Sequence, residues 1–259
     1  MAMKLSTKKR PDREVKMIKE GQTKFSERVF DDVTIRTLKE LMIKGVFSSL
    51  DFPIAHGKEA AVYRATKDAA DGGEKEYLAV KIFKFEGPSF QKRAQYLEGD
   101  KRFNMPGNKR EMVRIFAKKE FANLKLVNKA GVRAPRPVKC KDNVVVMEFL
   151  GEEGVPSELL IEAEILDPMG TVLKILENMR RMHEAGIVHV DLSEYNIINF
   201  HDEPYIIDVG QAVLTHHPQA SQFLRNDIHN LLKFFRKIGA GISEEIALEY
   251  IKGEIDAIS

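Results

Sequence analysis

Four polar residues in the second half of the sequence have types and spacing suited to phosphate chemistry. His189, Asp191 and Asn196 lie in the segment GIVHVDLSEYNIINF, and a further aspartate, Asp208, follows the apolar run YII. A carboxylate and an amide oxygen that converge from separate loops can hold Mg²⁺ against phosphate oxygens. A second carboxylate can orient an attacking hydroxyl and accept its proton. Each residue alone is more typical of a turn, but the set together favours phosphoryl transfer.

The two segments match two motifs of protein kinases. HVDLSEYN, at 189–196, matches the catalytic loop H-R-D-x-x-x-x-N, and IDVG, at 207–210, matches the metal-binding D-F-G. Enzymes with these motifs use a lysine from the β-rich half of the chain to bind the α- and β-phosphates, and a glutamate holds that lysine. The elements that precede the two loops must therefore supply a lysine and a glutamate that meet.

Lys81 and Glu120 are the predicted pair. Lys81 lies inside the apolar strand pattern LAVKIF, where a charged side chain needs a partner unless the strand lies at a sheet edge. In the helix that follows, Glu120 shares one stripe with Phe116 and Leu124, so its carboxylate faces the core and also needs a partner. Glu111 is the alternative, but its helical neighbours form a less continuous apolar face.

A phosphate-covering loop is predicted before this lysine. The kinase pattern G-x-G-x-x-G-x-V, anchored on Val62, retains only Gly57 of its three glycines. A glycine at this point still allows close approach of the backbone to a phosphate. Lys58 would add a positive charge beside it.

Hydrophobic periodicity and the positions of Gly and Pro predict an α+β protein with two lobes and a cleft between them. We expect a basic, partly flexible segment 1–30, a β-rich lobe 31–150 with a leading helix and a mobile insertion 86–110, and a reduced helical lobe 151–259 with both polar loops. Helices are predicted at about 31–47, 109–130, 157–165, 170–185, 221–238 and 243–256, and strands at 51–55, 60–66, 77–84 and 144–151, with two short strands after the catalytic loop.

The composition is that of a globular protein, with 43% hydrophobic and 31% charged residues and a formal net charge of +2. No apolar run is long enough for a transmembrane helix, and the N-terminus lacks the apolar core of a secretory signal. Cys140 is the only cysteine, which excludes an internal disulfide and a cysteine-based zinc cluster. We therefore expect a cytoplasmic protein with no membrane partner.

Charge is distributed unevenly along the chain. Lys and Arg are in excess at 1–24 and 84–120, whereas 151–210 is acidic. Such runs are often solvated faces, but the basic segments are also suited to a polyanion, and acidic residues can serve a metal.

Seven segments carry a family resemblance: GKEAAVY, AVKIF, KKEFANL, MEFLG, HVDLSEYNI, IIDVGQAV and HHPQASQFLRNDIHNLLKFF. Together they resemble the RIO family of atypical serine/threonine protein kinases over roughly residues 31–240, and a glycine-poor phosphate loop is typical of that family. The opening helix and GKEA resemble the branch without an N-terminal winged helix. The lack of long extensions resembles the archaeal members.

The resemblance implies an ATP site between the lobes. Lys81 would contact the phosphates and pair with Glu120, and Asp191 would be the catalytic aspartate. Asn196 and Asp208 would hold the metal, Mg²⁺ or alternatively Mn²⁺. ATP would also contact Gly57, Lys58 and Val62, with Met147 at the gatekeeper position and the backbone of Glu148 and Leu150 facing adenine.

Departures from typical kinases limit the substrate. Val190 replaces the usual catalytic-loop arginine, so no phosphorylated activation loop need dock there. The stretch from Gly210 to Asp227 is short and lacks A-P-E, and little chain follows it, so we expect no conventional peptide groove. By the same resemblance, Asp227 would be a buried structural residue that supports the catalytic loop.

The RIO resemblance implies a role in small ribosomal subunit maturation. The chain would act as an ATP-dependent serine kinase or ATPase and bind the pre-ribosomal small subunit, its rRNA and its ribosomal proteins. The basic segments 1–24 and 84–120 would suit contact with rRNA phosphates.

Two other functions remain open at this point. Antibiotic and choline kinases share H-x-D-x-x-x-x-N followed by I-D, so a small-molecule phosphotransferase is one alternative, although GKEAAVY and the short C-terminal half argue against it. The other is a ribosome-binding scaffold that nucleotide switches without turnover. Within the kinase hypothesis, Asp208 or Asp191 could itself take the phosphoryl group, as in aspartyl-phosphate ATPases.

Overall fold

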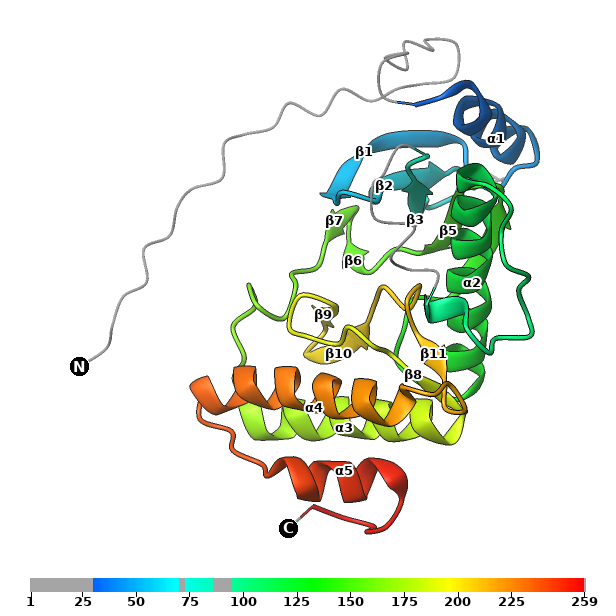
Figure 1. The fold of residues 1–259 in the computed structure, drawn as a ribbon. Coiled ribbons are helices and arrows are strands. Elements are labelled where there is room, and N and C mark those ends of the chain that lie inside the picture. Colours follow the sequence, from blue (N-terminus) through cyan, green and yellow to red (C-terminus); the bar gives the residue numbers. More distant parts are fainter. Residues whose placement is uncertain (1–29, 70–72, 86–94, 259) are drawn as a thin grey trace.

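The protein folds into two lobes, which confirms the predicted α+β, kinase-like architecture (Figure 1). Its structure is a computed structural model that describes residues 30–69, 73–85 and 95–258. The upper lobe in Figure 1 holds a five-stranded antiparallel sheet, and the lower lobe is mostly helical. In the described part of the chain, no helix is long and apolar enough to cross a membrane.

The sheet of the upper lobe has the strand order β1-β2-β3-β5-β4, with every neighbouring pair antiparallel. Its register places Lys81 beside Val62 on one neighbouring strand and Val145 on the other. The strands are β1 (Ser49–His56), β2 (Ala60–Lys67), β3 (Glu76–Phe83), β4 (Pro137–Lys141) and β5 (Val144–Glu148).

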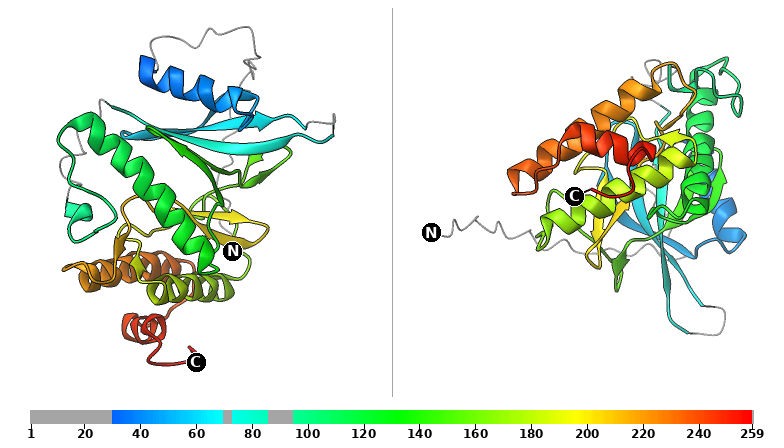
Figure 2. Two further views of the ribbon diagram at one scale, coloured as in Figure 1. Left: turned by 90° about the vertical axis from the view of Figure 1, so that its right-hand side faces the viewer. Right: turned by 90° about the horizontal axis from the view of Figure 1, so that it is seen from below.

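One helix covers each face of this sheet, α1 (Asp32–Ile43) on one side and α2 (Lys109–Lys129) on the other (Figure 2). Because successive side chains of a strand point to opposite faces, Val144 and Val146 pack in the same cluster as α1, whereas Val145 and Met147 pack in the cluster of α2. Because β5 is buried on both faces, its sequence VVVM is a continuous apolar run and does not alternate with polar residues. The predicted insertion 86–110 is described only from residue 95 onward.

The lower lobe packs three helices beneath two small strand pairs (Figure 1). Asp167 caps α3, accepting a hydrogen bond from the amide of Gly170, and Pro168 takes the first helical position, where its missing N–H costs nothing. The elements are α3 (Pro168–Glu184), α4 (Ala220–Lys237) and α5 (Glu244–Lys252), the pair β8 (Ile187–Val188) with β11 (Val213–Leu214), and the pair β9 (Ile197–Phe200) with β10 (Glu203–Ile206). Between the lobes, β6 (Gly151–Glu152) pairs with β7 (Val155–Pro156).

The predicted helix at 157–165 is wrong, because the segment pairs with a strand instead. Leu159 forms an isolated antiparallel bridge with Ile198, and the amide of Leu160 donates to the carbonyl of Ile197 at 2.8 Å. The residues of this segment are good helix formers, but burying Leu160 against β9 outweighs that preference.

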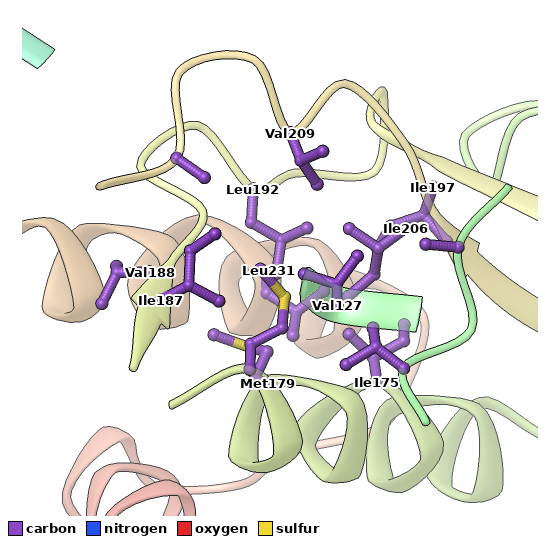
Figure 3. Close-up of a cluster of buried hydrophobic side chains, with 14 of the residues drawn as sticks. Val127, Ile175, Met179, Ile187, Val188, Leu192, Ile197, Ile206, Val209 and Leu231 are labelled. Carbon is purple, nitrogen blue, oxygen red and sulfur yellow. The ribbon is translucent and has the colours of Figure 1, made fainter. Parts of the chain in front are cut away.

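A cluster of buried apolar side chains supports both polar loops from below (Figure 3). Leu192, next to Asp191, and Val209, next to Asp208, both lie in this cluster. They pack there with side chains from α2, α3 and α4, including Val127, Ile175 and Leu231. The two loops are therefore fixed relative to each other by one hydrophobic core.

Candidate active site

A cavity of about 790 Å³ lies between the lobes. One part of its wall is apolar and includes Ala79, Met147 and Ile207. Another part is charged and polar, with Lys81, Glu120, Asn196 and Asp208 among the lining residues. A cavity of this size, mostly apolar with a few polar groups that converge, is typical of a small-molecule or cofactor site.

Lys81 bridges two carboxylates in this cavity. Its Nζ lies 2.8 Å from Oε1 of Glu120 and 2.9 Å from Oδ1 of Asp208. Burial alone would lower the pKa of Lys81, but the negative charges of Asp208 and Glu120 outweigh it and raise the pKa. The ammonium group therefore keeps its charge although the residue is only 7% exposed.

The predicted pairing of Lys81 with Glu120 is confirmed, and strand and helix periodicity explain it. On β3, Lys81 shares the face of Ala79, which packs toward α2, whereas Val80 faces α1. The alternative, Glu111, is exposed, and its Oε2 accepts a hydrogen bond from the amide of Gly107. Its carboxylate caps the start of the helix and does not reach the cavity.

Two side chains of the catalytic loop form hydrogen bonds to backbone carbonyls that hold the loop in shape. Asn196 donates from Nδ2 to the carbonyl of Asp191 at 2.7 Å, and His189 donates from Nε2 to the carbonyl of Ile207 at 2.9 Å. The second bond joins the catalytic loop to the residue before Asp208. Asp191 has an exposed side chain and lies outside the cavity lining, whereas Asn196 forms part of the wall.

Asp227 supports the same loop from α4 and is 1% exposed. Its carboxylate accepts hydrogen bonds of 2.9 Å from the amides of Val190 and Leu192. Burial raises the pKa of Asp227 to about 6, although His189 and the two amide bonds act in the opposite direction. This position and these contacts fit the structural role expected for Asp227.

The loop between β1 and β2 contains Gly57 and Lys58, and both line the cavity together with Val62. The amide of Gly57 donates to the carbonyl of Ala60 at 2.8 Å, and Lys84 donates to the carbonyl of Gly57 at 2.8 Å. A lysine just beyond β3 therefore ties this loop to the sheet, a contact that the sequence did not indicate.

The apolar end of the cavity is formed in part by β5 and the residues after it. Met147, Glu148 and Leu150 line the cavity. The carbonyl of Leu150 accepts a hydrogen bond from the amide of Ser157 at 3.0 Å, and Glu148 exchanges hydrogen bonds with Arg136. These bonds fix the strand that leads from the upper lobe into the lower one.

The side chains at the polar end fit a magnesium ion that is shared with a nucleotide. Asp208 presents a carboxylate that is 46% exposed, and Asn196 adds an amide in the same wall. Among the described residues, no three His, Cys, Asp or Glu side chains gather as a metal cage. Mg²⁺ usually takes only one or two protein carboxylates and completes its shell with phosphate oxygens and water, so the set is sufficient.

Two further side chains at this site were not recognised in the sequence. Lys119 and Asn123, both on α2, are fully buried and donate hydrogen bonds to backbone carbonyls of the segment 209–212. In the sequence, Lys119 is one of two adjacent lysines, which are typical of a solvent-exposed surface. Its burial depends on a segment about ninety residues later in the chain.

Comparison with known proteins places this geometry in a family. A family model for the RIO domain matches residues 61–248. The chain is 41% identical to the RIO-type serine/threonine-protein kinase Rio1 of Haloferax volcanii, covering 90% of this chain and 79% of that protein. It is 35% identical to Rio1 of Methanocaldococcus jannaschii, covering 95% and 86%.

A solved structure shares the fold. It is a Rio2 kinase from Chaetomium thermophilum, described as an ADP/Mg²⁺-phosphoaspartate complex, with a TM-score of 0.64 and 20% sequence identity. The alignment covers 90% of this chain and 70% of that chain. The shared fold, the family match and the identity to Rio1 proteins over most of their length lead to one conclusion: the chain belongs to the RIO family of serine/threonine-protein kinases.

Proposed function

We propose that the protein is an atypical serine kinase with ATPase activity that uses ATP and Mg²⁺, with Mn²⁺ as a possible substitute. The observation that carries this proposal is Lys81 held between Glu120 and Asp208 at the polar end of a largely apolar cavity. The apolar end suits a purine base, and the buried ammonium group suits the phosphates.

Each polar side chain has a role in the proposed reaction. Lys81 would bind the α- and β-phosphates while Glu120 holds its ammonium group in place. Asp208 and Asn196 would hold Mg²⁺, which supplies positive charge to the phosphate oxygens when bound. Asp191 would orient the attacking group and accept its proton.

The structure after Asp208 favours an acceptor other than a docked peptide. Segment 209–212 is bonded to α2, and β11 follows at once and pairs with β8. α4 then begins at Ala220. Within the described residues, no long extended segment follows the predicted metal-binding motif at 207–210. In typical kinases, a segment of this kind holds the peptide.

Asp208 is the carboxylate better placed to take the phosphoryl group itself. It lines the cavity, whereas Asp191 lies outside the lining. An Asp208 oxygen would attack the γ-phosphorus, the bond from that phosphorus to the β–γ bridging oxygen would break, and ADP would leave. Water would then hydrolyse the acyl phosphate to regenerate the carboxylate and release inorganic phosphate. The phosphoaspartate in the description of the Rio2 structure supports this route.

The kinase proposal is tested by incubating the full chain with γ-labelled ATP and Mg²⁺. We expect release of inorganic phosphate and label on the protein, and Asp191→Asn should reduce the rate of phosphate release. If hydroxylamine removes the label, the product is an acyl phosphate. If the label is stable in acid, the product is phosphoserine. No phosphate release and no label at saturating ATP would contradict the proposal.

A small-molecule phosphotransferase is the competing function. The segment between the lobes and α3, residues 157–167, packs against β9 and contributes Leu159 to the cavity wall. This segment is short, so it supplies little of the separate acceptor pocket that such enzymes need. Rapid transfer to an aminoglycoside or amino-alcohol panel would displace the kinase proposal.

The finer part of the proposal is a cytoplasmic role in small ribosomal subunit maturation. Its support is the family resemblance and exposed basic side chains such as Lys101, in the stretch before α2, and Lys109, at the start of α2, which suit rRNA phosphates. Asp208→Ala, purified from its native cells, should retain small-subunit rRNA. Recovery of the protein without rRNA or ribosomal proteins would count against this role.

A further inference from the structure

The backbone just after Asp208 is anchored by a lysine that the proposed reaction does not use. Lys119, on α2, is 0% exposed. Its Nζ donates to the carbonyl of Gly210 at 3.2 Å and also to the carbonyl of Ala212. Both acceptors lie within four residues of Asp208, so the ammonium group fixes the segment through which this carboxylate is positioned.

A second buried side chain continues the same contact one helical turn later. Asn123 donates from Nδ2 to the carbonyls of Val209 at 2.9 Å and Ala212 at 3.3 Å. Its Oδ1 accepts a hydrogen bond of 2.9 Å from Arg102, which in turn binds Asp100 through two nitrogens. The amide of Asn123 is thus held on both sides, and its orientation is determined.

Asp100, in the described stretch before α2, joins this network through Arg102. Burial would raise the pKa of Asp100, but the hydrogen bonds from Arg102 and the charge of Lys119 outweigh burial and lower it. The network therefore runs from residues 100–102 through α2 to segment 209–212. It connects α2 and the residues shortly before it to a segment more than eighty residues later in the chain.

Packing alone does not account for a lysine at position 119. A buried ammonium group is costly unless its hydrogen bonds are satisfied, and an apolar side chain of similar length would fill the same space at lower cost. The bonds that Lys119 makes instead restrain a backbone with unusual geometry, because Asp208 has a φ of +60°. Aspartate tolerates this left-handed region better than most non-glycine residues, but the region is still less favourable than for glycine, and surrounding contacts help to hold it.

We infer that Lys119 and Asn123 are positioning residues for the metal site: they hold segment 209–212 so that the Asp208 carboxylate is preorganised for a divalent cation bound with nucleotide. This inference rests on the proposed function, since it takes Asp208 as a metal ligand. It assigns no contact between Lys119 and the nucleotide. Its expected signature is a change in metal dependence, not in the affinity for nucleotide alone.

The test is the Mg²⁺ dependence of ADP binding, measured by isothermal titration calorimetry on the full chain. Lys119→Met keeps the length of the side chain and removes the donor. Lys118→Met, at the exposed neighbouring position, is the matched control.

Mg²⁺ should increase the affinity of wild-type protein for ADP. For Lys119→Met we expect the Mg²⁺ concentration that gives half of this increase to rise about 10- to 100-fold, the range for residues that orient metal ligands. Binding of ADP in EDTA should stay the same, and Lys118→Met should behave as wild type.

The outcomes separate the inference from the proposed function. If Lys119→Met melts at a lower temperature but has the wild-type Mg²⁺ requirement, its role is structural and the inference is overturned. If wild-type protein binds ADP equally well with and without Mg²⁺, the proposed metal site itself fails, and the inference falls with it.

A second variant keeps the test decisive if Lys119→Met does not fold. Asn123→Leu removes the bonds to Val209 and Ala212 without a change of net charge. It should raise the Mg²⁺ requirement in the same direction by a smaller, several-fold factor. A folded Asn123→Leu protein with unchanged Mg²⁺ dependence would overturn the inference.

Discussion

The carboxylate of Asp227 accepts a 2.9 Å hydrogen bond from the amide of Val190, whose φ is +82°. A β-branched residue in this region is strained, so the contact holds the catalytic loop in a conformation that it would not adopt alone. The second amide bond, from Leu192, fixes the other side of Asp191. Asp227 therefore shapes the catalytic loop by binding the loop's backbone amides, and it does not line the cavity.

This buried carboxylate predicts a specific dependence of stability on pH. Its folded-state pKa of about 6 lies above the ordinary value of 3.8, so between these values the folded state binds more protons than the unfolded state. Its contribution to stability therefore increases as pH falls from about 7 to 4, by up to about 3 kcal/mol. Asp227→Asn cannot titrate and should lack this contribution.

The measurement is the free energy of unfolding of wild type and Asp227→Asn in denaturant at several pH values. We expect the difference between the two proteins to shift in favour of wild type as pH decreases, since all other titrating groups are shared. A difference that stays constant from pH 7 to pH 4 would show that Asp227 does not titrate with a raised pKa.

The sequence predicted the parts of this site that depend on local periodicity. Lys81 was identified as the one charged residue within the apolar strand pattern LAVKIF, and the apolar stripe of α2 placed Glu120 on the inward face. The spacing within the two motif loops identified Asn196 and Asp208, which meet in one cavity. These features need only neighbouring residues to be recognised.

Features that depend on distant contacts were missed. The edge strand β4 was also missed, although it pairs with the adjacent β5, because it is short, contains Pro137 and two lysines, and has no fully buried side chain. The segment 157–165 has helical propensity but pairs with β9, and Lys119 is buried only because segment 209–212 covers it. No window of local sequence contains both partners of these last two contacts, whereas β4 and its partner β5 are neighbours along the chain.

The Lys81–Glu120 pair predicts strongly coupled effects on stability. Lys81→Met leaves the carboxylate of Glu120, only 2% exposed, without this partner and should cost about 3–5 kcal/mol in free energy of unfolding. Adding Glu120→Gln to it removes the stranded charge. The double variant should therefore lose at least about 1 kcal/mol less than the sum of the two single losses, as measured by denaturant unfolding.

An exposed pair on the same sheet provides the control for this cycle. Lys67 and Glu76 lie at the same 2.8 Å separation, but their side chains are 45% and 53% exposed. Lys67→Met and Glu76→Gln should each cost about 1 kcal/mol or less, with little coupling. Equal coupling in the two cycles would mean that burial does not determine the strength of the Lys81–Glu120 interaction.

Gly210 allows the segment after Asp208 to approach α2 closely. A Cβ at this position would lie 3.1 Å from Oε2 of Glu120 and 3.7 Å from Oδ1 of Asp208. Gly210→Ala should displace the Glu120 carboxylate and cost about 1–3 kcal/mol in stability, and it should also weaken binding of Mg²⁺-ADP. Gly241→Ala is the control, because its Cβ would meet no atom within 4 Å. If the two variants are equally stable and bind alike, the approach at Gly210 is not restrictive.

The positions of Asp208 and Asp191 predict that nucleotide binding and phosphoryl transfer can be separated by mutation. Asp208 lines the cavity and contacts Lys81, so Asp208→Asn should abolish the Mg²⁺-dependent part of ADP binding. Asp191 lies outside the lining, so Asp191→Asn should bind Mg²⁺-ADP nearly as wild type. The rate at which Asp191→Asn releases phosphate from ATP should nevertheless fall by about 10²- to 10⁴-fold, the usual contribution of a positioned base.

Calorimetry measures the binding of Mg²⁺-ADP, and a single-turnover assay with γ-labelled ATP measures phosphate release. Loss of Mg²⁺-ADP binding in Asp191→Asn, with normal binding in Asp208→Asn, would reverse the assignment of the two aspartates.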